Sequence, residues 1–364
     1  MNRMKRISVA VLLAAGTAAG VLAAGCSSSK DAKQGVVATV NGDEIKTTEL
    51  REILGVPGGV FAVTDIPMER KKEALDQLVS WRLLTQDART RGLDNTQEYS
   101  DILRQNAQMV MIKALLRKEI AAKLKVTDKE IQAEIAKVKE ANKGIPDAAA
   151  AMQAVKTVFE GPTRKIQEEL IATAKKDTGA TIDQPAVNRI GKGEKVPDNA
   201  VLASAGEEKI SYGDVKKVLQ GLPMPGGPHG QPDLSKNPVV IANVLNRELT
   251  LRALNAYARK QGIEGTDIYK ATRKEMEWFV LRNLDAEKIV SKDLPVTDKE
   301  IEAAYAEHAQ QLIRNGKKIP LAQVKEQLRG YLQGEKGKKA LDTYVAELKK
   351  KAKITVDEVA LSKA

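Results

Sequence analysis

The sequence has few of the residues that most often carry catalysis or bind metal. Its 364 residues include one Cys, two His and only 3% aromatic residues. One Cys excludes a disulfide framework and a Cys-based zinc site, and two distant histidines, His229 and His308, argue against a His-rich metal centre. With so few aromatic residues, the core must be built from Ala, Leu, Val and Ile, which favours packed helices over a β-sandwich.

Common catalytic motifs are also missing from the sequence. No G-x-S-x-G, Walker or H-E-x-x-H pattern is present, and Gly58-Gly59 and Gly226-Gly227 lack the spacing of a dinucleotide-binding loop. Acidic residues are plentiful, but Lys three or four positions away on the same predicted helix indicates surface ion pairs. We therefore expect no cofactor and no metal.

The N-terminus has the pattern of a secretion signal. A basic start is followed by an apolar stretch, Ile7 to Gly25, and then by Cys26. The junction Leu22-Ala23-Ala24-Gly25-Cys26 resembles the lipobox of bacterial lipoproteins, although Ala23 stands where Leu is commonest. The resemblance implies cleavage before Cys26 and a diacylglycerol on its thiol. The alternative is an uncleaved membrane anchor, since the apolar stretch is nearly long enough to span a bilayer.

A lipid-bearing Cys26 would place the chain on a membrane surface of the cell envelope. The polar composition of residues 26–36 then indicates a flexible tether. Ser27 is not the Asp that often retains lipoproteins at an inner membrane, which favours the periplasmic face of the outer membrane in a two-membrane cell. Without residues 1–25 the chain has 56 basic and 48 acidic residues, a net charge of +8 spread over mixed-sign stretches, so we expect no nucleic-acid binding.

The sequence repeats itself. The hexapeptide Val126-Thr-Asp-Lys-Glu-Ile131 recurs unchanged as Val296-Thr-Asp-Lys-Glu-Ile301, an offset of 170 residues. Other identities occur at the same offset: Arg82 with Arg252, Leu84 with Leu254, Ala88 with Ala258, Gly92 with Gly262, Tyr99 with Tyr269 and Val110 with Val280. These matches predict two copies of one module, 37–183 and 199–364, joined by a linker at 184–198.

Each predicted copy has the same local signals. A β-branched run, Val37 to Val40, closes on the turn dipeptide Asn41-Gly42. Helical periodicity follows over 75–91 and 99–123, and the repeated VTDKEI contains an S/T-x-x-E capping box that starts another helix. A long final helix, 155–176 or 321–351, ends in a β-like tail. We expect each tail to pair with the strand that opens its own copy, which gives a mainly α fold of tandem helical modules with a short strand pair at their ends.

These segments resemble a known family. The stretches VVATVNGDEIKTTEL, VTDKEI and IPLAQVKEQLRGYLQGEKGKKALDTYVAELKKKAKITV are similar to the chaperone module of the SurA, PrsA and PpiD group of extracytoplasmic foldases. The resemblance implies a helical cradle for unfolded chains. Relatives commonly carry a parvulin-type prolyl isomerase domain before the late helix, but here that position holds only 134–143 and 305–318. A catalytic domain does not fit in either segment.

The two histidines do not restore a parvulin-like site. Such sites are similar to one another in gathering His side chains around a polar residue in a small β-sheet fold. His308 lies in a predicted helix and His229 in a turn-rich loop, Gly221 to Asp233. We interpret both as exposed or locally hydrogen-bonded side chains and expect no catalytic residue.

Client binding requires exposed apolar surface, and Met and Trp side chains supply adaptable contacts. The candidates in the first copy are Trp81, Met109 and Met111, and those in the second are Met276, Trp278 and Phe279. The competing interpretation places these residues in the core. The Pro-rich loop at 221–238 is either a mobile arm over the cradle or a tolerated insertion.

The sequence thus predicts a lipid-anchored, ATP-independent chaperone whose partners are unfolded or nascent secreted and envelope proteins. Two alternatives remain open. One is a peptidyl-prolyl cis-trans isomerase of the SurA, PrsA or EpsD type. The other is an accessory lipoprotein of an export or envelope-assembly system, with one fixed partner.

Overall fold

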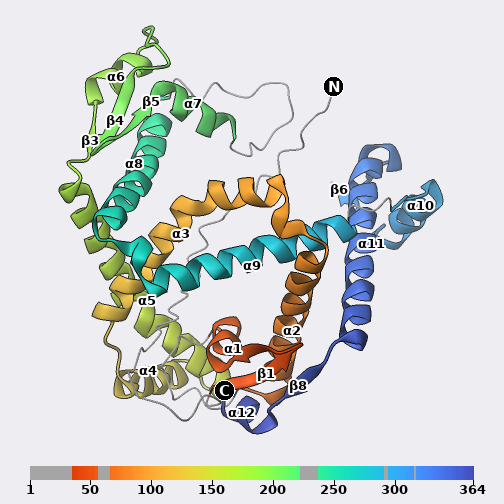
Figure 1. Ribbon diagram of the computed structural model, residues 1–364. Helices are drawn as coiled ribbons and strands as arrows, with labels where there is room; N and C mark the ends of the chain where they lie inside the picture. The colour runs from red at the N-terminus through yellow and green to blue at the C-terminus, as the bar shows by residue number, and fades with distance from the viewer. Residues whose placement is uncertain (1–34, 56–65, 222–236, 291–293, 315–316) are drawn as a thin grey trace. The chain divides into compact units, whose positions relative to one another are not determined.

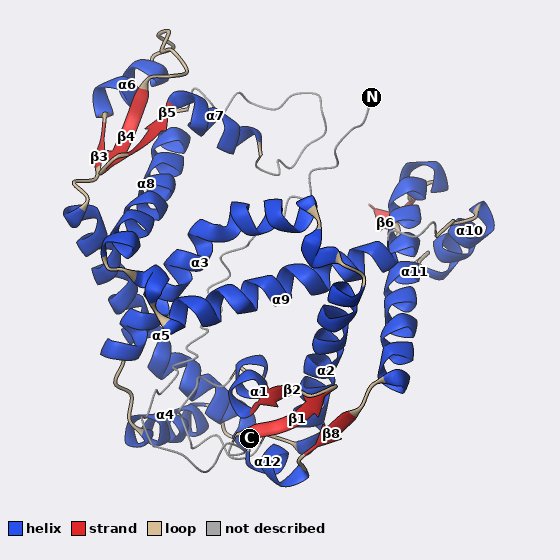
Figure 2. Ribbon diagram, viewed as in Figure 1, coloured by secondary structure: helices blue, strands red, loops and turns tan. Residues whose placement is uncertain are grey.

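A computed structural model of the protein describes residues 35–55, 66–221, 237–290, 294–314 and 317–364 (Figure 1). Cys26, the signal segment and most of the Pro-rich loop lie outside these residues. The described chain is mainly helical with small antiparallel sheets, which confirms the mainly α character of the predicted fold (Figure 2). It divides into two compact units. Of the described residues, the central unit is built around 106–273, and the terminal unit combines 35–54, 66–105 and those from 274 to 364.

The terminal unit joins the two ends of the described sequence. Two long helices, α3 (Gln97–Lys123) and α9 (Asp267–Val290), each begin in one unit and end in the other. The remaining elements of the terminal unit are β1 (Val36–Val40), β2 (Asp43–Lys46), α1 (Thr47–Ile53), α2 (Met68–Thr90), the 3-10 turn η1 (Leu93–Asn95), α10 (Asp298–Glu307), β6 (Ile313–Arg314), β7 (Lys317–Lys318), α11 (Leu321–Lys351), β8 (Ile354–Val356) and α12 (Glu358–Lys363).

The sheet of the terminal unit starts with the hairpin that the sequence predicts. Asn41 and Gly42 both have positive φ, 51° and 93°, as a tight two-residue hairpin turn requires. Strand β1 pairs with β2 on one side and with β8 on the other, in the order β2-β1-β8. The β1–β8 pairing is antiparallel and places Thr39 opposite Thr355, with their hydroxyl oxygens 2.6 Å apart. Residues more than 300 positions apart therefore close this sheet.

The central unit contains a sheet of the same construction. Strand β4 pairs with β5 through a hairpin, and β3 adds to the other edge of β4. Its elements are α4 (Asp128–Ala141), α5 (Asp147–Asp177), β3 (Thr181–Ile182), α6 (Gln184–Gly191), β4 (Val201–Ala205), β5 (Glu208–Ser211), α7 (Tyr212–Gln220), α8 (Pro238–Lys260) and the 3-10 turn η3 (Ile263–Gly265).

The strand pairing contradicts the expectation that each predicted copy closes on itself. The tail of the first predicted copy, β3, pairs with β4 of the second, and the tail of the second, β8, pairs with β1 of the first. The sequence does not predict this exchange, because each tail has the pattern of a strand but nothing in it specifies which hairpin it joins. The duplication itself stays a prediction, and so do its domain boundaries. The first eight residues of the predicted linker form α6, whose side chains Val187 and Ile190 are buried.

Helix starts follow the predicted capping chemistry. At the start of α4, Thr127 Oγ1 accepts a hydrogen bond from the Glu130 backbone N–H (3.3 Å), and Glu130 Oε2 accepts one from the Thr127 N–H (2.8 Å). Thr297 and Glu300 make the same pair of bonds at the start of α10. Both capping boxes are therefore confirmed. The end of α2 is also as predicted, because Gly92 follows it with φ 69°, a conformation that favours glycine.

The core consists of aliphatic clusters, as the low aromatic content predicts. In the central unit, α4 packs on α5 through Ile131, Val155 and Phe159, and through Val138, Ala150 and Ala154. In the terminal unit, α10 packs on α11 through Ile301, Val324 and Leu328. A third cluster joins α2 and η1 to α9 through Ala88, Leu93, Val280, Leu281 and Leu284. This last cluster holds together the two helices that carry the site described below.

A glycine in α11 gives a test of helix packing in the terminal unit. A Cβ added at Gly337 would lie 2.6 Å from Val290 Cγ1, whereas one at Gly334 in the same helix meets nothing within 4 Å. Gly334→Ala should raise the free energy of unfolding by about 0.5–1 kcal/mol through helix propensity. Gly337→Ala should instead lower it by about 1–2 kcal/mol because of overpacking. Urea denaturation followed by circular dichroism measures both, and a gain in both variants would contradict the close α9–α11 contact.

Candidate functional site

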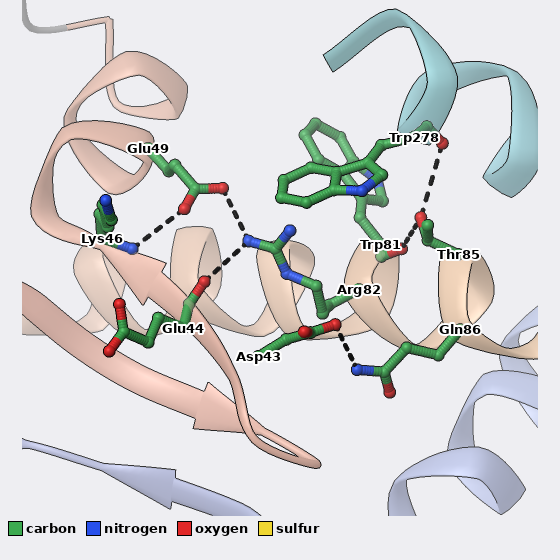
Figure 3. Close-up of polar contacts among 9 residues, drawn as sticks. All are labelled: Asp43, Glu44, Lys46, Glu49, Trp81, Arg82, Thr85, Gln86 and Trp278. Carbon is green, nitrogen blue, oxygen red and sulfur yellow. Dashed lines mark hydrogen bonds and ion pairs between the residues drawn. The ribbon is translucent and has the colours of Figure 1, made fainter. Parts of the chain in front are cut away.

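Arg82, in the middle of α2, is a buried cation held by the start of the chain. Its side chain is only 5% exposed. Its Nη2 donates to Glu49 Oε2 (2.9 Å) and to the backbone carbonyl of Glu44 (3.0 Å), as Figure 3 shows. Glu49 also accepts a hydrogen bond from the Lys46 backbone N–H (3.1 Å). Because a buried charge is costly unless it is paired, these bonds fix α2 against the β2–α1 corner.

Trp278, on α9, covers this ion pair. The guanidinium of Arg82 lies 3.9 Å from the centre of the Trp278 ring (Figure 3), and the ammonium of Lys274 lies 4.8 Å from the same ring. Such cation–π contacts are worth about 0.5–2 kcal/mol, more when they are shielded from water. Thr85 Oγ1 lies within hydrogen-bonding distance of the backbone carbonyls of Trp81 (2.8 Å) and Trp278 (3.5 Å). Helices α2 and α9 therefore share both an aromatic stack and a polar contact here.

Trp81 also stacks on an arginine, but here the ring belongs to α2 and the arginine to α9. The guanidinium of Arg282, on α9, lies 3.8 Å from the centre of the Trp81 ring and 5.1 Å from that of Phe279. Phe279 remains 40% exposed, and both Trp side chains are partly exposed. We call Trp81, Trp278, Phe279 and the cations Arg282 and Lys274 that stack on them the aromatic surface. It consists of rings that are held in place but still reach solvent.

The structure brings together three of the six predicted client-binding residues, Trp81, Trp278 and Phe279, in the aromatic surface. Met276 packs against the α2–α9 aliphatic cluster. Met109 and Met111 lie in the part of α3 that belongs to the central unit, and Met111 is 5% exposed, the position of a core residue. The ring of Trp81 is contacted by Arg282, which belongs to the second predicted copy.

The cations of the aromatic surface were not identified from the sequence. An arginine in a mixed-charge helix is indistinguishable from a solvated one until its neighbours are known. A usable signal did exist, because Lys274, Trp278 and Arg282 recur at intervals of four and so lie along one face of α9.

A second polar group lies deeper in the terminal unit. Asp285, on α9, has a fully buried side chain, and Arg91 Nη1 donates to its Oδ1 (2.6 Å). Within the described chain its Oδ2 has no hydrogen-bond partner. Burial, followed by the charge of nearby Asp87, raises the pKa of Asp285 to about 7, although Arg91 opposes the shift. Tyr344, on α11, donates to Asp87 Oδ2 (2.7 Å), and burial together with this bond raises the pKa of Tyr344 to about 12. The group ties α2, α9 and α11 together.

A small pocket lies beside this group, with Asp87 in its wall. Its volume is about 150 Å³, which corresponds to roughly five water molecules. The lining residues come from the β1–β2 turn, α2 and the end of α11: Asn41, Leu83, Gln86, Asp87, Thr90, Leu348, Lys351 and Ala352. A space this small and mixed in polarity suits bound water better than a peptide.

Only one of the two histidines, His308, lies among the residues that the structure describes. His308 directly follows the last residue of α10 and packs edge-on against Tyr331, with ring centres 5.5 Å apart. His308 is the C-terminal cap of this helix, whereas the sequence predicted a position inside the helix. His229 lies outside the described residues. Among the residues that the structure describes, no group of three or more His, Cys, Asp or Glu is arranged to hold a metal ion.

Comparisons with known proteins give no further guide. No protein-family model, curated protein or solved structure matches the chain. Within the described ranges, no helix is both long enough and apolar enough to cross a membrane.

Proposed function

We propose that the protein is a lipid-anchored, extracytoplasmic chaperone that binds unfolded or partly folded secreted and envelope proteins without ATP. The observation that carries the proposal is the aromatic surface. The chain has five Trp and Phe residues in total, and three of them, Trp81, Trp278 and Phe279, lie on this one surface and reach solvent. Large apolar groups left partly exposed in a small area favour protein binding.

The physical basis for client binding is contact with apolar segments that are rigidly presented. Stacking on Arg82 and Arg282 fixes the two indole rings, so little side-chain entropy is lost when a segment binds. Because only a few side chains contribute, each contact is weak and release needs no energy source. The lipid at Cys26 and its tether, both still predictions, would keep this surface close to the membrane where clients emerge.

Aggregation of denatured clients tests the proposal. With Cys26 replaced by Ser so that no lipid is attached, the mature chain should suppress light scattering by at least two unrelated denatured proteins. Phe279→Ser should require at least a threefold higher concentration for the same suppression. Val239→Ser, which removes an apolar side chain 67% exposed in the central unit, is the matched control and should have no effect.

Two outcomes would favour the alternatives. Faster cis-trans exchange of a proline peptide in the purified protein would indicate an isomerase. Failure to suppress aggregation, together with one tightly bound protein in a pull-down from envelope extracts, would indicate an accessory lipoprotein with a fixed partner.

A further inference from the structure

Arg282 differs from Arg82, the arginine that stacks on the ring of Trp278. Arg82 uses its Nη2 on Glu49 and on the Glu44 carbonyl. Arg282 contacts the rings of Trp81 and Phe279, but no acceptor among the described residues forms a hydrogen bond or ion pair with it. Its cation is thus positioned by aromatic faces while the edge of the guanidinium, which carries the N–H donors, is left unused.

The surroundings of Arg282 favour an anionic ligand. A guanidinium presents its donors in a planar fork that matches a carboxylate. Partial burial lowers the pKa of Arg282 to about 10, the direction expected for a cation that is partly removed from water. Lys274, two helical turns earlier on α9, stacks on Trp278 and likewise has no ion pair within the described chain. Two cations that stack on the rings of this surface, Arg282 and Lys274, thus have no counter-charge bound to them within the described chain.

We propose that Arg282 binds a carboxylate carried by an extended polypeptide, while Trp81 and Phe279 contact the apolar side chains next to it. This rests on the proposed function and narrows it, because the preferred client segment is an acidic residue flanked by apolar ones. Aromatic rings on the guanidinium suit apolar neighbours on the ligand, and a carboxylate accepts two parallel hydrogen bonds from the fork. A phosphate on a lipid headgroup also fits a guanidinium fork, and the experiment separates the two sources.

Intrinsic fluorescence gives a direct readout, because the two Trp residues of the chain, Trp81 and Trp278, both belong to the aromatic surface. The probes are acetyl-Ala-Leu-Val-Glu-Leu-Ala-amide and the same peptide with Gln in place of Glu. At low salt, the C26S chain should bind the Glu peptide at least tenfold more tightly than the Gln peptide. Added salt should reduce this preference, since the interaction is between charges near the surface.

Variants assign the preference to Arg282. Arg282→Gln should reduce it to less than twofold, and Arg282→Lys, which keeps the charge but not the fork, should leave an intermediate preference. Arg247→Gln removes one exposed arginine from the central unit and is the matched control, with no change expected.

Three results would overturn the assignment: equal affinity of the C26S chain for both peptides, an unchanged preference in Arg282→Gln, or fluorescence changes with anionic phospholipid vesicles but not with the Glu peptide. The aggregation assay distinguishes this failure from failure of the chaperone function. Suppression of aggregation without a Glu preference refutes the carboxylate site alone. A Glu preference without suppression supports the site and refutes the chaperone function.

Discussion

Replacing Arg91 with Gln should lower the free energy of unfolding of the terminal unit by about 1.4 kcal/mol more at pH 8 than at pH 5.5. Arg91 Nη1 lies 2.6 Å from Asp285 Oδ1, and the Asp285 side chain is fully buried. Removing one partner of a buried ion pair costs about 3–5 kcal/mol, because the remaining charge is uncompensated. At low pH, Asp285 takes up a proton and no longer needs the cation.

The sign of the pH dependence follows from the pKa of Asp285. Burial and nearby Asp87 raise this pKa from the ordinary 3.8 to about 7, and Arg91 opposes them. Since the folded pKa exceeds the unfolded one, the stability contributed by protonated Asp285 is complete below pH 3.8 and is lost as the pH rises through 7. Without Arg91 the pKa rises further, so the loss is larger and extends to higher pH. The difference between the two proteins therefore opens above about pH 7 and grows until the pH reaches the higher pKa of Asp285 in Arg91→Gln.

Urea denaturation followed by Trp fluorescence measures this effect in the terminal unit, because both Trp residues lie there. Asp285→Asn in the Arg91→Gln background is the control. Its neutral amide should restore part of the stability at pH 8 and remove most of the pH dependence. An equal loss at pH 5.5 and pH 8 in Arg91→Gln alone would show that Arg91 acts by packing and not by compensating the charge of Asp285.

Local structure was predictable from the sequence, since its causes are local. The turn at Asn41-Gly42, the capping boxes at Thr127 and Thr297, and the end of α2 at Gly92 each depend on a few adjacent residues. The final long helix of the second predicted copy was expected over 321–351, and α11 has these bounds. Helical periodicity and capping chemistry act over one or two turns, so they can be identified without knowing the fold.

Long-range pairing was not predictable in the same way. The tails β3 (Thr181–Ile182) and β8 (Ile354–Val356) have similar composition, and the two hairpins offer similar edges, with the same irregularity of register in each. Either tail has the pattern to pair with either hairpin. The choice depends on the course of the whole chain, including α3 and α9, which each pass from one unit to the other.

The residues of the candidate site show the same contrast between local and long-range causes. Its aromatic residues could be selected from composition, because Trp and Phe are rare in this chain. Arg82, Arg282 and Asp285 could not be selected, because their roles come from residues on other elements: Glu49 on α1, Trp81 on α2 and Arg91 at the end of α2. Burial of a charged side chain is a property of the fold, and a helix of mixed charge gives no sign of it.

The exchange of tails predicts a disulfide across the ends of the described chain. In the C26S chain, Thr39→Cys and Thr355→Cys should form a disulfide in nearly all molecules under mild oxidation. The two residues are directly opposite on β1 and β8, and their hydroxyl oxygens are 2.6 Å apart. Opposed residues of an antiparallel pair have the Cα separation that a disulfide requires. The bond would join residues 316 positions apart, which in the loop-entropy model stabilises the fold by about 6 kcal/mol.

Two further cysteine pairs make this result specific. Thr181→Cys with Ser204→Cys should also form a disulfide, because Thr181 Oγ1 and Ser204 Oγ are 3.1 Å apart in the central sheet. Thr39→Cys with Thr181→Cys represents a first copy closed on itself and should stay reduced. Mass spectrometry of linked tryptic peptides identifies each bond. If the Thr39–Thr181 pair cross-links and the Thr39–Thr355 pair does not, then each copy closes on itself, and the contacts of α11 with α2, including Tyr344 with Asp87, would have to be lost together with the exchange.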